Sequence, residues 1–435
     1  MRDTYPENIY EPKWLWGDKI NELLFCKEFL EIHPMICING TFFTADGRVT
    51  DENKLKKEIL KWIEPYVATG IPKKITNLLD TMRVLAYSEP LPTYTDRIFL
   101  TNGTYYLSGE FEDYRDFCTN RLPVAYNPDA PAPVQWLEFL DQLLYPEDIP
   151  TLQEYMGYCL IPSTKGQQML FLVGKGGEGK SRVGLVMRSL LGDNMGNGSI
   201  QKVETSPFAR ADLEHLLVLV DDDLKLEALS QTNYIKAIIT ADTPMDLERK
   251  GKQSYQGILH ARFLAFGNAS LQALHDRSHG FFRRQIILRV KPRDPHRQDD
   301  PYLGTRLAGE RDSIFLWALA GLYRLIGSNY RFTISSRTAE NLAQAIEQSN
   351  NMESFLKSQG YFRLDPCGCV SSRALYQCYQ EWCADNATQP FSPTTFRSCL
   401  TEKAGSLGLT YSHNIDIGCN RRVRGYRGIR LCRGV

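Results

Sequence analysis

The fold is decided by one stretch of sequence, Met169-Leu-Phe-Leu-Val173 followed by Gly174-Lys-Gly-Gly-Glu-Gly-Lys180-Ser181. The first part is apolar throughout and is typical of a buried strand. The second part fits the pattern G-x-x-x-x-G-K-[ST] in full. Beyond it, apolar residues recur at helical spacing, at Val183, Val186, Met187 and Leu190. A strand, a glycine-rich loop and a helix in this order predict a phosphate-binding loop in an α/β domain.

The residue types of this loop suit the phosphates of ATP. Glycines allow backbone N–H groups to converge on phosphate oxygens, and the start of the helix adds partial positive charge. We expect Lys180 to reach the β- and γ-phosphates and the Ser181 hydroxyl to ligate Mg²⁺. A chance glycine-rich turn, the alternative, does not explain the strand before the loop or the helix after it. The predicted nucleotide-binding residues are Gly174, Gly176, Gly177, Glu178, Gly179, Lys180, Ser181 and Arg182.

Three further apolar runs follow, at residues 216–220, 263–266 and 286–290. They alternate with helical patterns, as the buried strands of a largely parallel sheet do. The sequence therefore predicts an α/β core over residues 166–330.

Carboxylates end the run at 216–220, where Asp221, Asp222 and Asp223 follow directly. The carboxyl ends of parallel strands face the nucleotide crevice in such folds. We expect Asp221 to hold Mg²⁺ and Asp222 to polarise the attacking water. Asp223 is the alternative to Asp222, because a slip of one residue is invisible in the sequence. An acidic turn or a helix cap would give the same pattern without any catalytic role.

Polar residues also flank the other two runs. Asn268 follows one of them, where its amide could orient water beside the γ-phosphate. Arg283 and Arg284 precede the last run, and arginine suits the charge on a transferring phosphoryl group. In a ring, one protomer can supply such an arginine to its neighbour, and we favour Arg284. The alternatives are a turn residue for Asn268 and surface ion pairs for the arginines.

A compact basic loop lies between the runs at 216–220 and 263–266, at Glu248-Arg249-Lys250-Gly251-Lys252. Three cations around a glycine suit salt-sensitive contact with the backbone of a single strand. The alternative is a solvated charged surface. We predict that Arg249, Lys250 and Lys252 contact DNA.

The flanking sequence divides into three regions. Residues 1–94 form a mixed α/β accessory region, in which Asn39-Gly40 predicts a tight hairpin. Residues 95–165 form a region that we expect to be largely helical, because the period is helical from 134 to 160. Residues 331–435 form a linker followed by a basic module.

The C-terminal module carries the charge imbalance of the chain. Between residues 391 and 435, eight arginines and lysines face two acids, an excess of six positive charges. Short helices followed by a basic hairpin fit a winged-helix-like DNA-binding module, with Arg421, Arg422 and Arg424 contacting phosphates. A solvated terminal surface is the alternative. Seven cysteines lie after residue 366, but their spacing is not a common zinc pattern, so we expect free thiols.

Composition sets the limits on these predictions. The 435 residues carry 51 basic and 51 acidic side chains, so the net charge is zero and a wholly basic DNA-coating protein is excluded. No apolar run reaches the length of a membrane span, and the first residues lack the apolar core of a secretory signal. We therefore expect a cytoplasmic protein with no membrane partner.

These motifs together resemble the superfamily 3 helicases, and within them the phage and plasmid primase-helicases related to the poxvirus primase-helicase. The resemblance is carried by GKGGEGKS, LLVLVDD, ERKGK, FLAFGN and FFRR, by FCTNRLP and LQEYMG upstream, and by ERDSIFLWALAGL downstream. It implies an AAA+-like ATPase preceded by a collar-like segment. It also implies a ring, usually a hexamer, that hydrolyses ATP between subunits while its basic hairpin tracks one strand 3′→5′. Residues 1–94 are too few for a complete primase, so a separate primase or loader could supply that function.

The sequence thus predicts an ATP-dependent replicative DNA helicase of a mobile genetic element, a phage, plasmid or genomic island. Its cofactors would be ATP and Mg²⁺, and its partners single-stranded and forked DNA. Two other functions fit the same motifs. One is an origin-binding initiator whose ATPase is an assembly switch, and the other is a primase that carries its own helicase.

Overall fold

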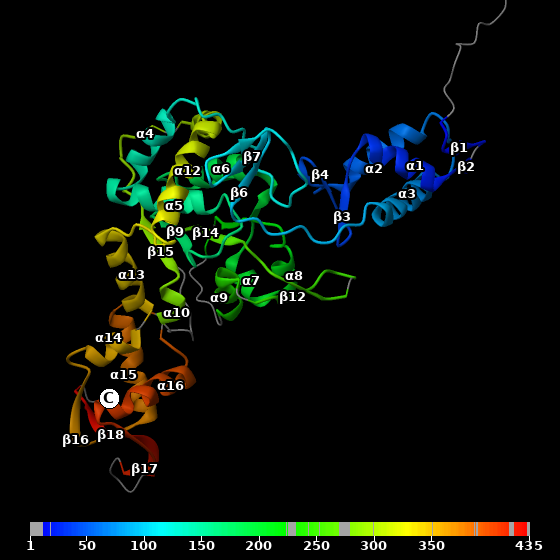
Figure 1. Ribbon diagram of the computed structural model, residues 1–435. Helices are drawn as coiled ribbons and strands as arrows, with labels where there is room; N and C mark the ends of the chain where they lie inside the picture. The colour runs from blue at the N-terminus through cyan, green and yellow to red at the C-terminus, as the bar shows by residue number, and fades with distance from the viewer. Residues whose placement is uncertain are drawn as a thin grey trace, which may run out of the picture. The chain divides into compact units, whose positions relative to one another are not determined.

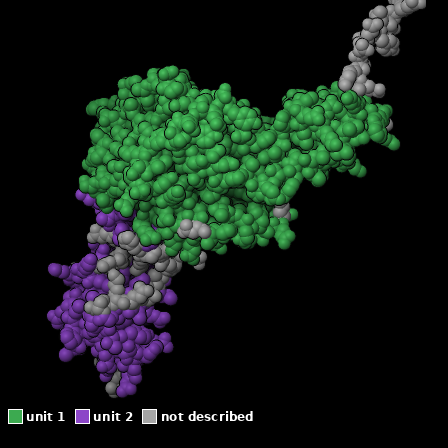
Figure 2. Space-filling model, in the orientation of Figure 1, with its two compact units in different colours: residues 1–271, 283–339 green, residues 272–282, 340–435 purple. Residues whose placement is uncertain are grey.

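The computed structural model describes residues 12–17, 19–222, 224, 232–241, 243–251, 253–268, 279–298, 300–349, 351–386, 388, 390–416 and 422–432. Its contacts separate two compact units (Figure 2). Unit 1 comprises residues 1–271 and 283–339, and unit 2 comprises residues 272–282 and 340–435. Within the described residues, none of the helices combines the length and the apolar character that crossing a membrane requires.

A parallel five-stranded sheet forms the centre of unit 1 (Figure 1). Its strands are β9 (Met169–Val173), β10 (Met195–Asn197), β11 (Val218–Asp221), β14 (Arg262–Gly267) and β15 (Gln285–Arg289). They lie in the order β10-β11-β14-β9-β15, and each neighbouring pair is parallel. The four predicted runs are all strands, which confirms a mixed α/β core with a parallel sheet. The carboxyl ends of all five strands therefore lie along one edge.

Helix α6 (Lys180–Leu191) follows β9 and packs on this sheet. It buries Val183, Val186, Met187 and Leu190, the apolar positions that predicted it. A side chain at Gly184 would place its Cβ 2.8 Å from the ring of Phe266, so glycine permits the close approach of helix and sheet. Helix α6 therefore lies close against β14 of the sheet.

Two helices joined by glycine contacts brace the same unit, α5 (Ile149–Tyr158) and α12 (Arg311–Gly327). A Cβ at Gly157 would lie 2.3 Å from the Ala318 carbonyl oxygen, and one at Gly321 would lie 2.4 Å from that of Gln153. The Tyr155 hydroxyl donates to the Phe263 carbonyl at 2.7 Å, which ties α5 to β14.

The region expected to be largely helical, residues 95–165, has two parts. Its first part is a three-stranded antiparallel sheet of β6 (Arg97–Leu100), β7 (Gly103–Tyr106) and β8 (Phe111–Glu112). Its second part contains α4 (Val134–Leu143) and α5, which a 3₁₀ turn at Pro146–Asp148 separates. Proline has no backbone N–H to continue the helix, so the helical period of the sequence does not give one helix here.

The remaining elements of unit 1 are β1 (Leu15–Trp16), β2 (Lys19–Ile20), α1 (Glu22–Ile32), β3 (Ile36–Ile38), β4 (Thr41–Thr44), β5 (Gly47–Arg48), α2 (Glu52–Ile63), α3 (Ile71–Leu85), α7 (Ile200–Thr205), α8 (Pro207–Ala211), α9 (Asn233–Thr240), β12 (Met245–Leu247), β13 (Tyr255–Gly257) and α11 (Leu303–Gly309). The predicted hairpin is β3–β4, with positive φ at Asn39 and Gly40. Arg48 donates to the Glu214 carbonyl at 3.4 Å, which links the N-terminal elements to the core.

Unit 2 contains helices and an antiparallel sheet in the order β16-β18-β17. Its elements are α10 (His279–Phe282), α14 (Asn351–Lys357), β16 (Phe362–Ser371), α15 (Ser372–Asp385), α16 (Pro393–Ala404), β17 (Thr410–Asp416) and β18 (Arg422–Leu431), while α13 (Ser336–Ser349) begins in unit 1 and ends in unit 2. The described cysteines form no disulfide with one another, and the described residues contain no cluster of three potential metal ligands.

Candidate active site

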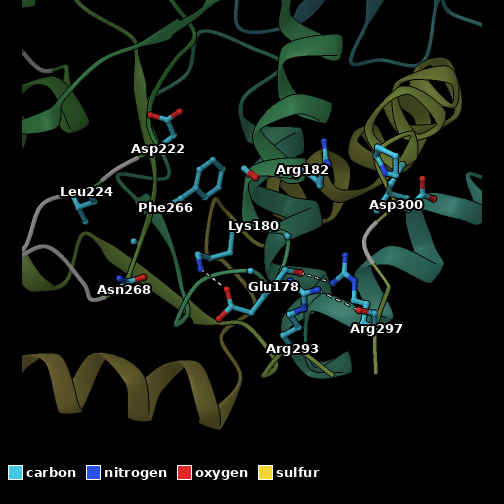
Figure 3. Close-up of a pocket in the computed structure, with 16 residues that line it drawn as sticks. Glu178, Lys180, Arg182, Asp222, Leu224, Phe266, Asn268, Arg293, Arg297 and Asp300 are labelled. Carbon is cyan, nitrogen blue, oxygen red and sulfur yellow. Dashed lines mark hydrogen bonds and ion pairs between the residues drawn. The ribbon is translucent and has the colours of Figure 1, made fainter. Parts of the chain in front are cut away.

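A cavity of about 780 Å³ opens at the carboxyl edge of the parallel sheet (Figure 3). Eight predicted nucleotide-binding or catalytic residues line it: Gly177, Glu178, Gly179, Lys180, Ser181, Arg182, Asp222 and Asn268. Its other lining residues include Phe266, Arg293, Arg297 and Asp300. The sequence motifs from β9, β11 and β14 therefore converge on one volume.

The glycine loop reaches this cavity through left-handed backbone conformations. Gly176, Gly177 and Gly179 have φ values of +112°, +81° and +105°. Residues with a Cβ rarely adopt such values, so glycine is required for the path of the loop. Gly174 is needed for space instead, because a Cβ there would lie 2.4 Å from the Val290 side chain.

The Glu178 side chain folds back into the loop that carries it. Its carboxylate accepts hydrogen bonds from the Gly176 N–H at 2.9 and 3.0 Å and pairs with Lys180 Nζ at 2.8 Å. Burial of Glu178 opposes its ionisation, but the hydrogen bonds from Lys180 and Gly176 outweigh that effect and hold the pKa of the carboxyl below its usual value. The Glu178 carboxylate thus occupies the Gly176 N–H and the Lys180 ammonium, the two groups of the loop best suited to bind phosphate.

The two adjacent aspartates occupy different environments. Asp222 lines the cavity, whereas Asp221 is buried and accepts a hydrogen bond from the Ile200 N–H at 2.9 Å, at the start of α7. Asp221 is the last residue of β11, and Asp222 is the first residue beyond the strand. The structure therefore does not bring Asp221, the residue expected to hold Mg²⁺, to the cavity. Asp223 lies outside the described residues.

Two arginines that the sequence analysis did not single out also contact the loop, from the segment after β15. Arg297 Nη1 donates to the Glu178 carbonyl at 2.8 Å, and Arg293 Nη2 donates to the Arg297 carbonyl at 3.3 Å (Figure 3). A Cβ at Gly177 would lie 3.2 Å from Arg293 Nη1. In the sequence, the only sign of these two residues is that they are cations in a polar, proline-containing stretch. Such a stretch is typical of a surface loop and does not by itself predict contact with the glycine loop.

Arg283 and Arg284 lie at the opposite edge of the sheet. They immediately precede β15, and their carbonyls accept hydrogen bonds from Gln168 Nε2 and the Met169 N–H, at the start of β9. Five strand residues, about 16 Å, separate this edge from the cavity. These arginines therefore do not belong to the cavity of their own chain.

The basic loop is the tip of an antiparallel hairpin formed by β12 and β13. Arg249 lies at its base, where Nη2 pairs with Glu214 at 2.6 Å and Nε donates to the Tyr255 hydroxyl at 3.2 Å. Lys250 is exposed at the tip, beside Gly251 with φ +75°. The predicted DNA-contacting role thus suits Lys250 better than Arg249. Lys252 lies outside the described residues.

The predicted C-terminal contacts belong to unit 2. Arg422 and Arg424 are exposed on β18, and Arg422 is paired in register with Asp416 of β17. Arg421 lies outside the described residues.

Comparisons with known proteins match two separate parts of the chain. Residues 20–144 match the family described as "D5 N terminal like", and residues 172–284 match a "Family of unknown function (DUF5906)". No curated protein matches the sequence.

Solved structures resemble nearly the whole chain. The apo structure of the NrS-1 C-terminal region has a TM-score of 0.52 at 10% sequence identity, and its A-form apo structure has 0.51 at 11%. Each comparison covers 94% of this chain and 99% of the solved one. At such identity the likeness shows the fold alone. The D5-type match over residues 20–144 supports the resemblance of this chain to the phage primase-helicase family.

Proposed function

We propose that this chain is an ATP-dependent DNA helicase of a mobile genetic element and belongs to superfamily 3. The observation that carries the proposal is the convergence of the glycine loop, Lys180, Asp222 and Asn268 on one cavity at the carboxyl edge of a parallel sheet. That edge, where the loop from β9 meets the ends of neighbouring strands, is the usual position for a nucleotide in open α/β folds.

The lining of the cavity fits a magnesium-bound nucleoside triphosphate. Lys180, Arg182, Arg293 and Arg297 supply positive charge, and the loop glycines supply backbone donors. Ser181 and Asp222 would hold Mg²⁺, which neutralises charge on the transferring phosphoryl group when it is bound. Asn268 would orient the attacking water. In this proposal Asp222 takes the metal-holding role that the sequence suggested for Asp221.

The arginine finger would come from another copy of the chain. Arg284, or Arg283 beside it, lies about 16 Å from its own cavity, the length of β15, and so would complete the cavity of a neighbour. We therefore propose a ring, with six members as in the resembled family. Lys250 at the hairpin tip would follow the strand 3′→5′, and unit 2, as a winged-helix-like module, would hold forked DNA. A separate primase or loader would act with it.

The test is ATP turnover by matched variants of the full chain. Lys180→Ala should abolish turnover, and Asp222→Asn should lower it by about 10²–10⁴-fold while nucleotide still binds. Asp221→Asn should instead lower the free energy of unfolding by about 1–2 kcal/mol, because it weakens the start of α7. Equal turnover by Asp222→Asn and the wild type would refute the proposed site.

A second function, an origin-binding initiator whose ATPase is an assembly switch, is favoured by the exposed Arg422 and Arg424 on β18 of unit 2. Strand displacement on a forked duplex distinguishes the two. A helicase displaces the strand at the expense of ATP and loses this activity when Lys250 and Lys252 are both changed to glutamine. An initiator hydrolyses ATP without displacing the strand.

A further inference from the structure

A second cavity, of about 350 Å³, lies wholly within unit 2, between α15, α16 and β18. We name it the α15–α16 notch. Its lining residues are Ser372, Arg373, Tyr376, Pro393, Thr394, Phe396, Arg397 and Tyr426. All eight belong to one unit, so the notch does not depend on how the two units are arranged.

The notch collects positive charge. Ser372 and Pro393 are the first residues of α15 and α16, so the positive ends of two helix dipoles face it. Arg373 and Arg397 add two exposed guanidinium groups, and no carboxylate is among the lining residues. Neither helix has an acidic residue in its first turn. Cations at helix starts weaken a helix, and such a departure from the local rule is typical of a functional site.

One hydroxyl group in the notch lacks a partner. The Ser372 hydroxyl is buried, and no described group meets hydrogen-bond geometry with it. The Tyr426 hydroxyl, also buried, interacts with that of Thr401. An unpaired buried donor costs about 1–3 kcal/mol. A ligand with several acceptor oxygens, such as a phosphate, would give the Ser372 hydroxyl its partner.

One wall of the notch is an oriented aromatic ring. The Tyr376 hydroxyl donates to the Phe391 carbonyl at 2.6 Å, and the Tyr376 ring packs edge-on against Phe396 at 5.4 Å. These contacts fix the ring while leaving it partly exposed. A fixed aromatic face beside a basic groove suits the stacking of an unpaired base.

We propose that the α15–α16 notch binds one nucleotide of single-stranded DNA. Arg373, Arg397 and the Ser372 hydroxyl hold its phosphate, and Tyr376 stacks on its base. That the ligand is DNA rests on the proposed function, whereas the affinity for phosphate rests on the notch alone. The phosphate is either an internal one of the backbone or a terminal 5′-phosphate, and the test below separates them.

The experiment measures binding of a 3′-labelled oligothymidylate to the full chain by fluorescence anisotropy, without ATP. Arg373→Gln and Arg397→Gln should each weaken binding about five- to tenfold and lower the slope of log Kd against log salt by about one. Ser372→Ala should weaken binding without changing that slope. Arg363→Gln, an exposed arginine of β16 that does not line the notch, is the matched control and should bind within twofold of wild type.

Several outcomes would overturn the notch. The proposal is refuted if both arginine variants bind the oligothymidylate with wild-type affinity. It is also refuted if Arg363→Gln loses as much affinity as they do. An equal loss of affinity for blunt duplex would exclude a single-strand site. Thermal unfolding checks that each variant folds.

Two oligonucleotides, one with a 5′-hydroxyl and one with a 5′-phosphate, identify the phosphate. Tighter binding of the 5′-phosphate form that disappears in Arg397→Gln assigns the terminal phosphate, and equal binding of the two forms assigns an internal one. Because no ATP is used, the notch and the proposed function fail separately. An inactive ATPase with notch-dependent DNA binding refutes only the helicase, and an active ATPase with unaltered notch variants refutes only the notch.

Discussion

Glu178 holds two groups that a phosphate would otherwise bind, the Gly176 N–H and the Lys180 ammonium. When nucleotide binds, Lys180 must therefore either leave this carboxylate or contact the carboxylate and a phosphate at the same time. In Glu178→Gln the acceptor for Gly176 remains, but the charge that neutralises Lys180 is lost. We expect this variant to bind ADP severalfold more tightly than wild type by titration calorimetry.

The matched variants for this prediction are Glu178→Ala and Lys180→Ala. Glu178→Ala also removes the acceptor for the Gly176 N–H. A difference in ADP affinity between Glu178→Ala and Glu178→Gln therefore measures how much this hydrogen bond helps to hold the loop in its binding conformation. Weaker ADP binding by Glu178→Gln would show that the carboxylate holds the loop in its binding conformation and does not compete with phosphate.

A histidine in unit 1 should make stability depend on pH. Burial, helped by repulsion from Arg262, lowers the pKa of His260 from 6.5 to about 4. Between these two values the unfolded chain binds a proton that the folded chain does not, so the free energy of unfolding falls as the pH falls through this window.

Urea unfolding followed across that window tests the effect of His260. The loss of stability on acidification should be smaller in His260→Gln than in wild type. His296→Gln removes an exposed histidine of the same unit and should keep the wild-type dependence. Identical curves for wild type and His260→Gln would contradict the prediction.

The loop residues of the cavity could be predicted from sequence because their chemistry is local: φ values, glycine positions and a lysine at a fixed spacing. Asp221 and Asp222 could not be ranked, since the residue at which the strand ends is fixed only when its register in the sheet is known. Arg293 and Arg297 could not be found at all. They reach the loop by a turn of the chain after β15, and nothing in their own sequence marks that path.

At the scale of elements, the crossing of α5 and α12 depends on glycine. Gly321→Ala would bring a Cβ to within 2.4 Å of the Gln153 carbonyl oxygen, so the helices must move apart. We expect a loss of about 1–3 kcal/mol in the free energy of unfolding, measured with urea. Gly327→Ala on the same helix meets no atom within 4 Å and should be neutral or slightly stabilising. Similar losses in both variants would show that the close approach at Gly321 does not set the cost.

In the β12–β13 hairpin, we expect Arg249 to have a structural role and Lys250 to contact DNA. Arg249→Gln removes the pairing with Glu214 and the hydrogen bond to Tyr255, so we expect faster proteolytic cleavage of the hairpin. Lys250→Gln should leave the cleavage rate unchanged and weaken only the binding of single-stranded DNA. The reverse pattern would place Arg249 at the DNA and Lys250 in the framework.

Elements with strong apolar patterns were predictable, and those without were not. The strands β9, β11, β14 and β15 are buried runs with a clear signal. Strand β10 is a short edge strand that contains Gly196, and β16 contains Pro366 and Gly368, so both lack that signal. They become strands because neighbouring strands offer hydrogen bonds, which is information from distant sequence.

At the scale of the whole molecule, the proposed ring predicts complementation between inactive variants. Lys180→Ala lacks a working loop but keeps its arginines, and Arg284→Ala keeps the loop but lacks the finger. In an equal mixture, about a quarter of the interfaces would combine a good loop with a good arginine. We expect about a quarter of wild-type ATP turnover, far above that of either variant alone.

The same mixture with Arg283→Ala decides which arginine is the finger. If Arg284 acts within its own chain, the mixture stays as inactive as its components. Sedimentation of each variant confirms that assembly itself is intact.

Strand β15 has Arg283 and Arg284 before its first residue, and the segment after its last residue carries Arg293 and Arg297 to the glycine loop. All five of its residues pair in register with β9, so β15 runs without a break from one edge of the sheet to the other. In a closed ring, the arginines before β15 would contact the triphosphate of the neighbouring subunit. The arginines after β15 would contact the loop that binds the triphosphate of their own subunit. Hydrolysis at one site would then change the position of the arginines at the adjacent site. The subunits of the ring would hydrolyse ATP sequentially and not at random.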